Sequence, residues 1–140
     1  MAVKFEWNEV YELGISEIDL QHKKLIDISN DLFDVVTKGD ENFKISMSKI
    51  LKNLTDYTVY HFTSEEHFMA KYGYQGTPMH KIAHDNFVSE VTQQIKKLEN
   101  GSQNDVLVFY DYIANWILAH IAKADKIWAK FVIEKMLWWA

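Results

Sequence analysis

The chain has 140 residues, 48% of them hydrophobic and 25% charged, which suits one ordinary folded domain. It has no Cys, five Gly and one Pro. This composition excludes disulfide scaffolds, thiolate metal sites and cysteine nucleophiles, and it disfavours a turn-rich β fold. The net charge of −5 is not that of a chain with a basic surface for binding nucleic acid. Residues 1–7 carry charges where a signal peptide is apolar, and no apolar run is long enough to span a bilayer, so we expect a cytoplasmic, helical domain without membrane insertion.

Apolar residues at helical spacing, separated by turn residues, predict four long helices. We expect them at residues 17–38, 42–72, 78–99 and 104–126. Connections this short make successive helices antiparallel. The sequence therefore predicts an all-α, up-down-up-down four-helix bundle, as a single domain over residues 1–140.

Local signals mark two of the expected helix starts. Ser16 and Asp19 have the spacing of a capping box, with Ile15 and Leu20 as its hydrophobic staple. Thr77-Pro78 predicts an N-cap followed by proline at the first helical position.

The last residues, 127–140, form an apolar helical extension rich in Trp. We expect this segment to fold back against the open end of the bundle, near Trp7. The alternative is a surface for a signalling domain or for a second copy of the chain.

Histidines in helical pairs provide the main functional signal. His61 and Glu65 lie four residues apart on the expected second helix, and His80 and His84 have the same spacing on the third. Residues four apart share one face of a helix, so each pair can point at the bundle axis. Each pair alone is equally compatible with a solvated face. His67 follows Glu65 by two residues and is therefore expected on the surface.

Asp125 lies five residues after His120, a separation of about 140° on an ideal helix. Both side chains can face one site only if the helix widens locally, as π-type turns at functional sites do. The sequence therefore predicts a local departure from α-helical geometry between these two residues.

Helix direction places seven polar groups at one level of the bundle. Three lie near the starts of the first and third helices, and four lie late in the second and fourth. The groups are His22, His61, Glu65, His80, His84, His120 and Asp125. A lone buried His is usually a hydrogen-bonded core residue, but burying seven polar groups without a partner is costly. Metal binding is the better explanation.

Imidazole and carboxylate ligands without thiolate suit iron, zinc, copper or manganese. Seven ligands exceed the four that one zinc ion takes, and they fit two metals bridged by carboxylates. In this order and spacing they resemble the haemerythrin family, including bacteriohaemerythrins and the haemerythrin-like domains of bacterial chemotaxis receptors. The resemblance covers about Phe5 to Asp125 and includes Gln21-His22, His61-Phe62 and Glu65-Glu66.

The resemblance implies two non-haem irons and reversible O2 binding for storage, delivery or sensing, without enzymatic activity. One iron would be held by His80, His84 and His120. The other would be held by His22 and His61 and would keep an open position for O2. Glu65 and Asp125 would bridge the irons, together with an oxo or hydroxo group.

An apolar wall would protect the bound O2 from water and protons. Residues one helical turn from the ligands can form it, although ordinary core packing explains each of them equally well. They are Leu25, Phe62, Trp116, Ile117 and Ile121. Ile117 departs from the Leu expected in the family, and its β-branched shape is stiffer.

Two other functions remain open. A di-iron peroxidase or oxidase, or a redox sensor that autoxidises rapidly, would use the same open position. An enzyme would need a polar acid or base there, and Tyr57 is the nearest candidate, although it also suits the core. Metal storage, or a bundle merely stabilised by metal, is the third hypothesis.

Overall fold

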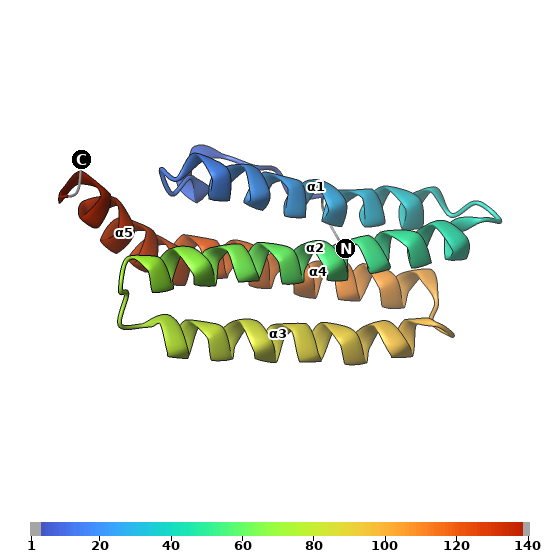
Figure 1. Cartoon of the computed structure of the whole chain (residues 1–140). Helices are drawn as coiled ribbons and strands as arrows, with labels where there is room; N and C mark the ends of the chain where they lie inside the picture. Colours follow the sequence, from blue (N-terminus) through green and yellow to red (C-terminus); the bar gives the residue numbers. More distant parts are fainter. Residues whose placement is uncertain (1–3, 139–140) are drawn as a thin grey trace.

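The computed structural model describes residues 4–138, and all of their regular structure is helical. A 3-10 helix, η1 (Glu9–Tyr11), precedes four long helices, which are α1 (Ser16–Lys38), α2 (Phe43–Lys71), α3 (Thr77–Leu98) and α4 (Gln103–His120). A π-helical turn, η2 (Ile121–Asp125), then joins α4 to α5 (Lys126–Trp138). Figure 1 shows the four long helices as an antiparallel bundle, which confirms the predicted fold class.

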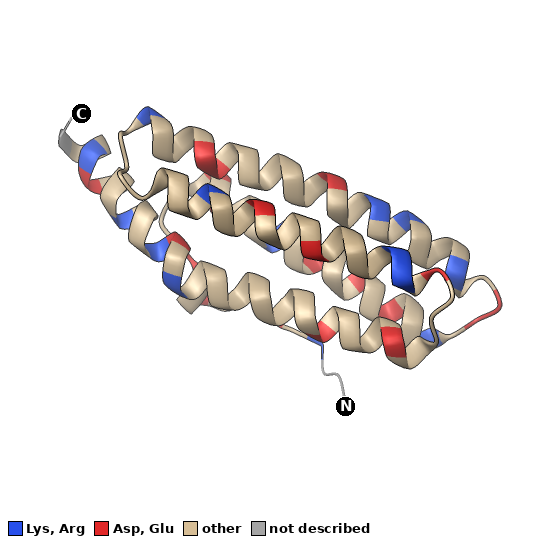
Figure 2. Ribbon diagram, turned by 90° about the horizontal axis from the view of Figure 1, so that it is seen from below, with Lys and Arg blue, Asp and Glu red and all other residues tan. Residues whose placement is uncertain are grey.

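Helix packing follows the order of the chain. α1 contacts α2 and α4, and α3 contacts α2 and α4, so each helix has two neighbours around one core. Side chains such as Leu32, Leu54 and Ile113 are almost completely buried in this core. Acidic and basic residues are interspersed along the helices (Figure 2). Within the described part of the chain, no helix is long and apolar enough to cross a membrane.

The start of α1 differs from the expectation. Ile15 is the N-cap and Ser16 is the first helical residue, without a side-chain cap. The carboxylate of Asp19 instead accepts hydrogen bonds from the backbone N–H groups of Leu13, at 2.8 Å, and Gly14, at 3.1 Å. The predicted capping box is therefore wrong, because the preceding loop supplies the donors that Asp19 accepts.

Two other local signals were also misplaced. Leu20 is 63% exposed, so it cannot form a buried staple with Ile15. Gly76, not Thr77, is the N-cap of α3, although Pro78 lies in the first turn as expected. A capping box does occur at α4, where Ser102 and Asp105 bond reciprocally.

The C-terminal segment takes a different path from the one expected. It does not reverse direction but continues α4 through the π turn into α5 (Figure 1). Trp128 and Val132 are buried, and the ring of Phe131 lies 5.5 Å from that of Tyr74. The first half of α5 therefore covers the end of the bundle, while Leu137 is 73% exposed. Residues 139–140 lie outside the described part of the chain.

Candidate metal centre

The seven residues predicted from spacing come together inside the bundle. They are contributed by α1, α2, α3, α4 and η2, and none of their side chains is more than 9% exposed. They form two groups that share Glu65, and within each group the nearest ligand atoms lie within 4.8 Å of one another. Five imidazoles and two carboxylates therefore occupy one enclosed site.

The larger group holds three imidazoles. The Nε2 atom of His120 lies 3.1 Å from Nε2 of His80 and 3.2 Å from Nε2 of His84. Oδ1 of Asp125 lies 2.9 Å from Nε2 of His80 and 3.2 Å from Nε2 of His120. Three ring nitrogens that meet so closely cannot all carry protons, and their lone pairs suit a shared cation.

The smaller group holds His22, His61 and Glu65. Nε2 of His22 lies 3.1 Å from Oε2 of Glu65, and Nε2 of His61 lies 3.4 Å from Oε1. Both carboxylates also reach across to the other group. Oδ2 of Asp125 lies 3.3 Å from Nε2 of His22, and Oε1 of Glu65 lies 3.3 Å from Nε2 of His84. The two carboxylates therefore lie between the two sets of imidazoles.

The π-helical turn predicted between His120 and Asp125 is confirmed, since η2 spans Ile121–Asp125. The wider turn brings Asp125 to the same side as His120, which an α-helix would not do. Trp128 donates a hydrogen bond from Nε1 to Oδ1 of Asp125, at 3.0 Å. The indole thus fixes a carboxylate at the centre.

Two imidazoles are oriented by hydrogen bonds on their outer side. Nδ1 of His61 lies 2.7 Å from Oε1 of Gln21, and Nδ1 of His84 lies 2.9 Å from Oε2 of Glu66. Because both partners accept, each Nδ1 carries the proton and each Nε2 lone pair faces the centre. This is the usual outer-shell arrangement of metal-binding histidines.

Burial and neighbouring groups shift the pKa values of the imidazoles in this site in opposite directions. Burial and the neighbouring imidazoles lower the pKa of His84 to about 2. Burial also lowers the pKa of His61 well below its usual value, with His22 adding to the effect. Burial acts in the same direction on His22, but its close contacts with the carboxylates of Asp125 and Glu65 outweigh it and raise its pKa to about 9.

The pKa values of the two carboxyl groups are also shifted in opposite directions. Burial and the charge of Asp125 raise the pKa of Glu65 well above its usual value. Burial would raise the pKa of Asp125 too, but its close contacts with the imidazoles of His120, His22 and His80 hold it well below its usual value. Oε1 of Glu65 and Oδ2 of Asp125 are buried without a hydrogen-bond partner. Such buried acceptors are costly unless a cation compensates them.

A small cavity of about 10 Å³ adjoins this cluster. Its lining includes four members of the cluster, His22, His61, His120 and Asp125, together with Leu25, Thr58, Phe62, Trp116, Ile117 and Ile121. The open surface of the cavity is apolar, and its volume is near the lower limit for a water-sized guest. All five residues expected in the wall therefore border one cavity, and Tyr57 does not.

A model of the Hemerythrin HHE cation binding domain matches residues 13–132 of the chain. The chain belongs to the haemerythrin family. It is 32% identical over 126 residues to the Bacteriohemerythrin of Clostridium acetobutylicum, covering 87% of this chain and 96% of that protein. The Bacteriohemerythrin of Methylococcus capsulatus is 34% identical over 110 residues, covering 79% and 82%. The crystal structure of wild-type hemerythrin superposes with a TM-score of 0.79 at 30% identity, covering 93% of this chain and 98% of that one.

Several supporting residues of this haemerythrin-family site were missed from the sequence. Thr58 borders the cavity and lies three residues before His61, a spacing that marks the same helix face. Trp128 similarly lies three residues after Asp125. Gln21 precedes His22 and contacts His61 on another helix, which no spacing within one helix reveals. His67 is exposed on α2, as expected.

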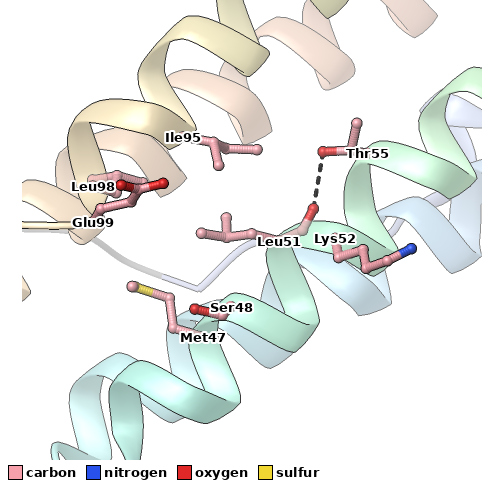
Figure 3. A pocket seen from close by; sticks show the side chains of 8 residues that line it. All are labelled: Met47, Ser48, Leu51, Lys52, Thr55, Ile95, Leu98 and Glu99. Carbon is pink, nitrogen blue, oxygen red and sulfur yellow. Dashed lines mark hydrogen bonds between the residues drawn. The ribbon is translucent and has the colours of Figure 1, made fainter.

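A second hollow lies between α2 and α3 (Figure 3). Its volume is about 250 Å³, and its walls are formed by Met47, Ser48, Leu51, Lys52, Thr55, Ile95, Leu98 and Glu99. Glu99 is the only one of these lining residues with a metal-ligating side chain. The hollow therefore lacks the set of ligands that the histidine cluster offers.

Proposed function

We propose that the chain binds O2 reversibly at a non-haem di-iron centre, for oxygen storage, delivery or sensing. His80, His84 and His120 would hold one iron, and His22 and His61 would hold the other. Glu65 and Asp125 would bridge the pair, since each lies within 3.4 Å of imidazole nitrogens from both sets. When bound, the two ferrous ions supply the electrons that O2 binding requires.

The residues present fit such a centre. Nitrogen and carboxylate oxygen donors suit iron, and the two buried oxygens without hydrogen-bond partners are what bridging carboxylates would offer. The hydrogen bonds of Gln21 and Glu66 keep the Nε2 lone pairs of His61 and His84 directed inward. These residues orient the ligands without touching a metal.

The apolar cavity is the observation that carries the proposal of O2 binding over catalysis. It borders both imidazoles of the set with fewer ligands, His22 and His61, but only His120 among the three imidazoles of the other set, and its open surface is apolar. Leu25, Ile117 and the other wall residues would exclude water and protons from a bound ligand. A peroxidase or oxidase would need an acid or base there, and Tyr57, the candidate for that role, does not line the cavity.

An anaerobic-to-aerobic optical titration of the iron-loaded protein, with metal analysis, tests this proposal. We expect two irons per chain and an absorption band that appears with O2 and disappears under vacuum. Immediate conversion to a ferric form without a recoverable oxygenated state would favour the redox sensor or the enzyme. Fewer than two irons per chain would contradict the di-iron centre.

A pair of matched variants tests the role of the cavity. Ile117→Phe adds a ring to the cavity wall, and we expect it to abolish reversible O2 binding while both irons remain. Ile95→Phe makes the same change in the hollow between α2 and α3, where there is more room, and should bind O2 normally. Unchanged O2 binding by Ile117→Phe would contradict the proposed position of the ligand.

A further inference from the structure

His120 is oriented differently from the two imidazoles that donate hydrogen bonds from Nδ1. His61 is held by Gln21 and His84 by Glu66. Within residues 4–138, the Nδ1 atoms of His22, His80 and His120 have no such partner, and all contacts of His120 with polar atoms involve Nε2. Of these three imidazoles in the described part of the chain, His120 alone is stacked nearly parallel to another aromatic ring.

A stack of aromatic rings lies against the imidazole of His120. The ring of Trp116 lies 4.5 Å from that of His120, with 12° between their planes. Phe87 of α3 lies 3.8 Å from Trp116, with 9° between the planes. The three nearly parallel rings form a column that ties a ligand at the end of α4 to the middle of α3.

His120 lies at the junction between two kinds of helix. His120 is the last residue of α4, and the π-helical turn begins at the next residue. The hydrogen-bonding register changes there, so the turn that follows His120 is wider than the α-helical turn that precedes it. Trp116 lies one turn earlier, within the regular part of α4, and can hold the ring from the α-helical side.

We propose that Trp116 and Phe87 are positioning residues for His120, replacing the hydrogen bond that outer partners give to His61 and His84. The inference rests on the proposed function, because it takes His120 as a metal ligand. Loss of an outer partner typically lowers metal affinity by about 10- to 100-fold. We expect an effect near the lower end of that range, about tenfold, because stacking is weaker than a charge-assisted hydrogen bond.

Phe87→Leu is the sharpest test, since Phe87 belongs to neither the ligand cluster nor the cavity wall. Phe109→Leu is its matched control, because Phe109 is equally buried but lies outside the column. Titration of the metal-free proteins with Co²⁺ measures both sites. We expect about tenfold weaker binding at one of the two sites in Phe87→Leu, and wild-type binding in Phe109→Leu.

Substitution of Trp116 separates positioning from general stability. Trp116→Phe keeps a ring against His120 and should retain most of the metal affinity. Trp116→Leu removes the ring and should lower the affinity about tenfold. NMR of the metal-free protein gives an independent readout, because the imidazole protons of His120 lie in the ring current of Trp116. Those shifts should move in Trp116→Leu and Phe87→Leu but not in Phe109→Leu.

The outcomes distinguish the two proposals. Wild-type protein that binds fewer than two metal ions would overturn both. Two ions in the wild type, with equal affinities and unchanged His120 shifts in Phe87→Leu and Phe109→Leu, would overturn the positioning role alone.

Discussion

The two halves of the bundle are stabilised in different ways. The half that contains the α1–α2 and α3–α4 connections buries apolar side chains such as Leu32, Val36, Val91 and Val106, whose packing stabilises it without any ligand. The other half buries seven ionisable groups against one another. The second half also buries apolar side chains such as Ile18, Met69 and Trp128, but it alone combines them with a cluster of ionisable groups.

The polar half costs folding free energy when no cation is present. Its imidazoles and carboxyl groups have pKa values displaced in opposite directions, and two carboxylate oxygens are without hydrogen-bond partners. A metal that binds only the folded state would add its binding free energy to stability. Metal binding should therefore affect the polar half much more than the apolar half.

The largest effect is expected from Glu65→Ala. Glu65 is the one residue shared by both ligand groups, so its loss should greatly weaken binding of both metals. Metal content after desalting provides the measurement. Glu66→Ala is the control, because Glu66 contacts the outer nitrogen of His84 and the ammonium group of Lys81 but belongs to neither ligand group. It should lower affinity by about 10- to 100-fold while both sites persist. Two retained metals in Glu65→Ala would refute the bridging role.

Acid should destabilise the metal-free protein. The folded-state pKa values of His61 and His84 lie below the ordinary imidazole value of about 6.5, that of His84 at about 2. As the pH falls below 6.5 the unfolded state therefore binds protons first, and stability declines. The raised pKa of Glu65 opposes this trend, but two imidazoles outweigh one carboxyl group.

Alkaline pH should also lower stability, because the pKa of His22 is raised to about 9. The stabilisation from His22 is complete below pH 6.5 and is lost as the pH rises towards 9. Denaturant unfolding across pH 4–9 should therefore show a maximum near 6.5, with the exposed His67→Ala variant as control. A profile in the metal-free protein that rises steadily to pH 9 would contradict this account.

In the apolar half, Leu32→Ala should lower the free energy of unfolding by about 2–5 kcal/mol through the cavity it creates. Leu32 is completely buried and lies ten residues beyond His22 on α1. Denaturant titration measures the loss, and Co²⁺ titration should show both metal sites unchanged. A loss of metal affinity comparable to that of Phe87→Leu would show that the halves are coupled.

The smallest effect is expected from Ser102→Ala. The hydroxyl of Ser102 accepts from the backbone N–H of Asp105, at 3.2 Å, and its removal should cost about 1 kcal/mol. The midpoint of denaturant unfolding should fall slightly at constant m-value. Metal binding should not change, and a change would again argue against independent halves.

Local helix signals in the sequence were only partly reliable. The bounds of α1, α2 and α3 lie within one residue of those expected, and Gly39 ends α1 with φ of 60°, a conformation that glycine adopts easily. The capping box at Ser16 failed because Asp19 had other donors within reach. Helix length follows from periodicity over many residues, whereas a cap depends on a few competing hydrogen bonds.

The sequence by itself determined the helices, their alternating direction and the common level of the seven polar residues, because an α-helix has a fixed rise per residue and short connections make successive helices antiparallel. It also determined the π turn, since His120 and Asp125 can share a site in no other way. Only the tertiary structure decided the outer contacts of three of the five imidazoles, which are Gln21 for His61, Glu66 for His84 and the stacked rings of Trp116 and Phe87 for His120. These contacts join different helices, and their choice depends on helix rotation and packing, which spacing along one chain does not contain.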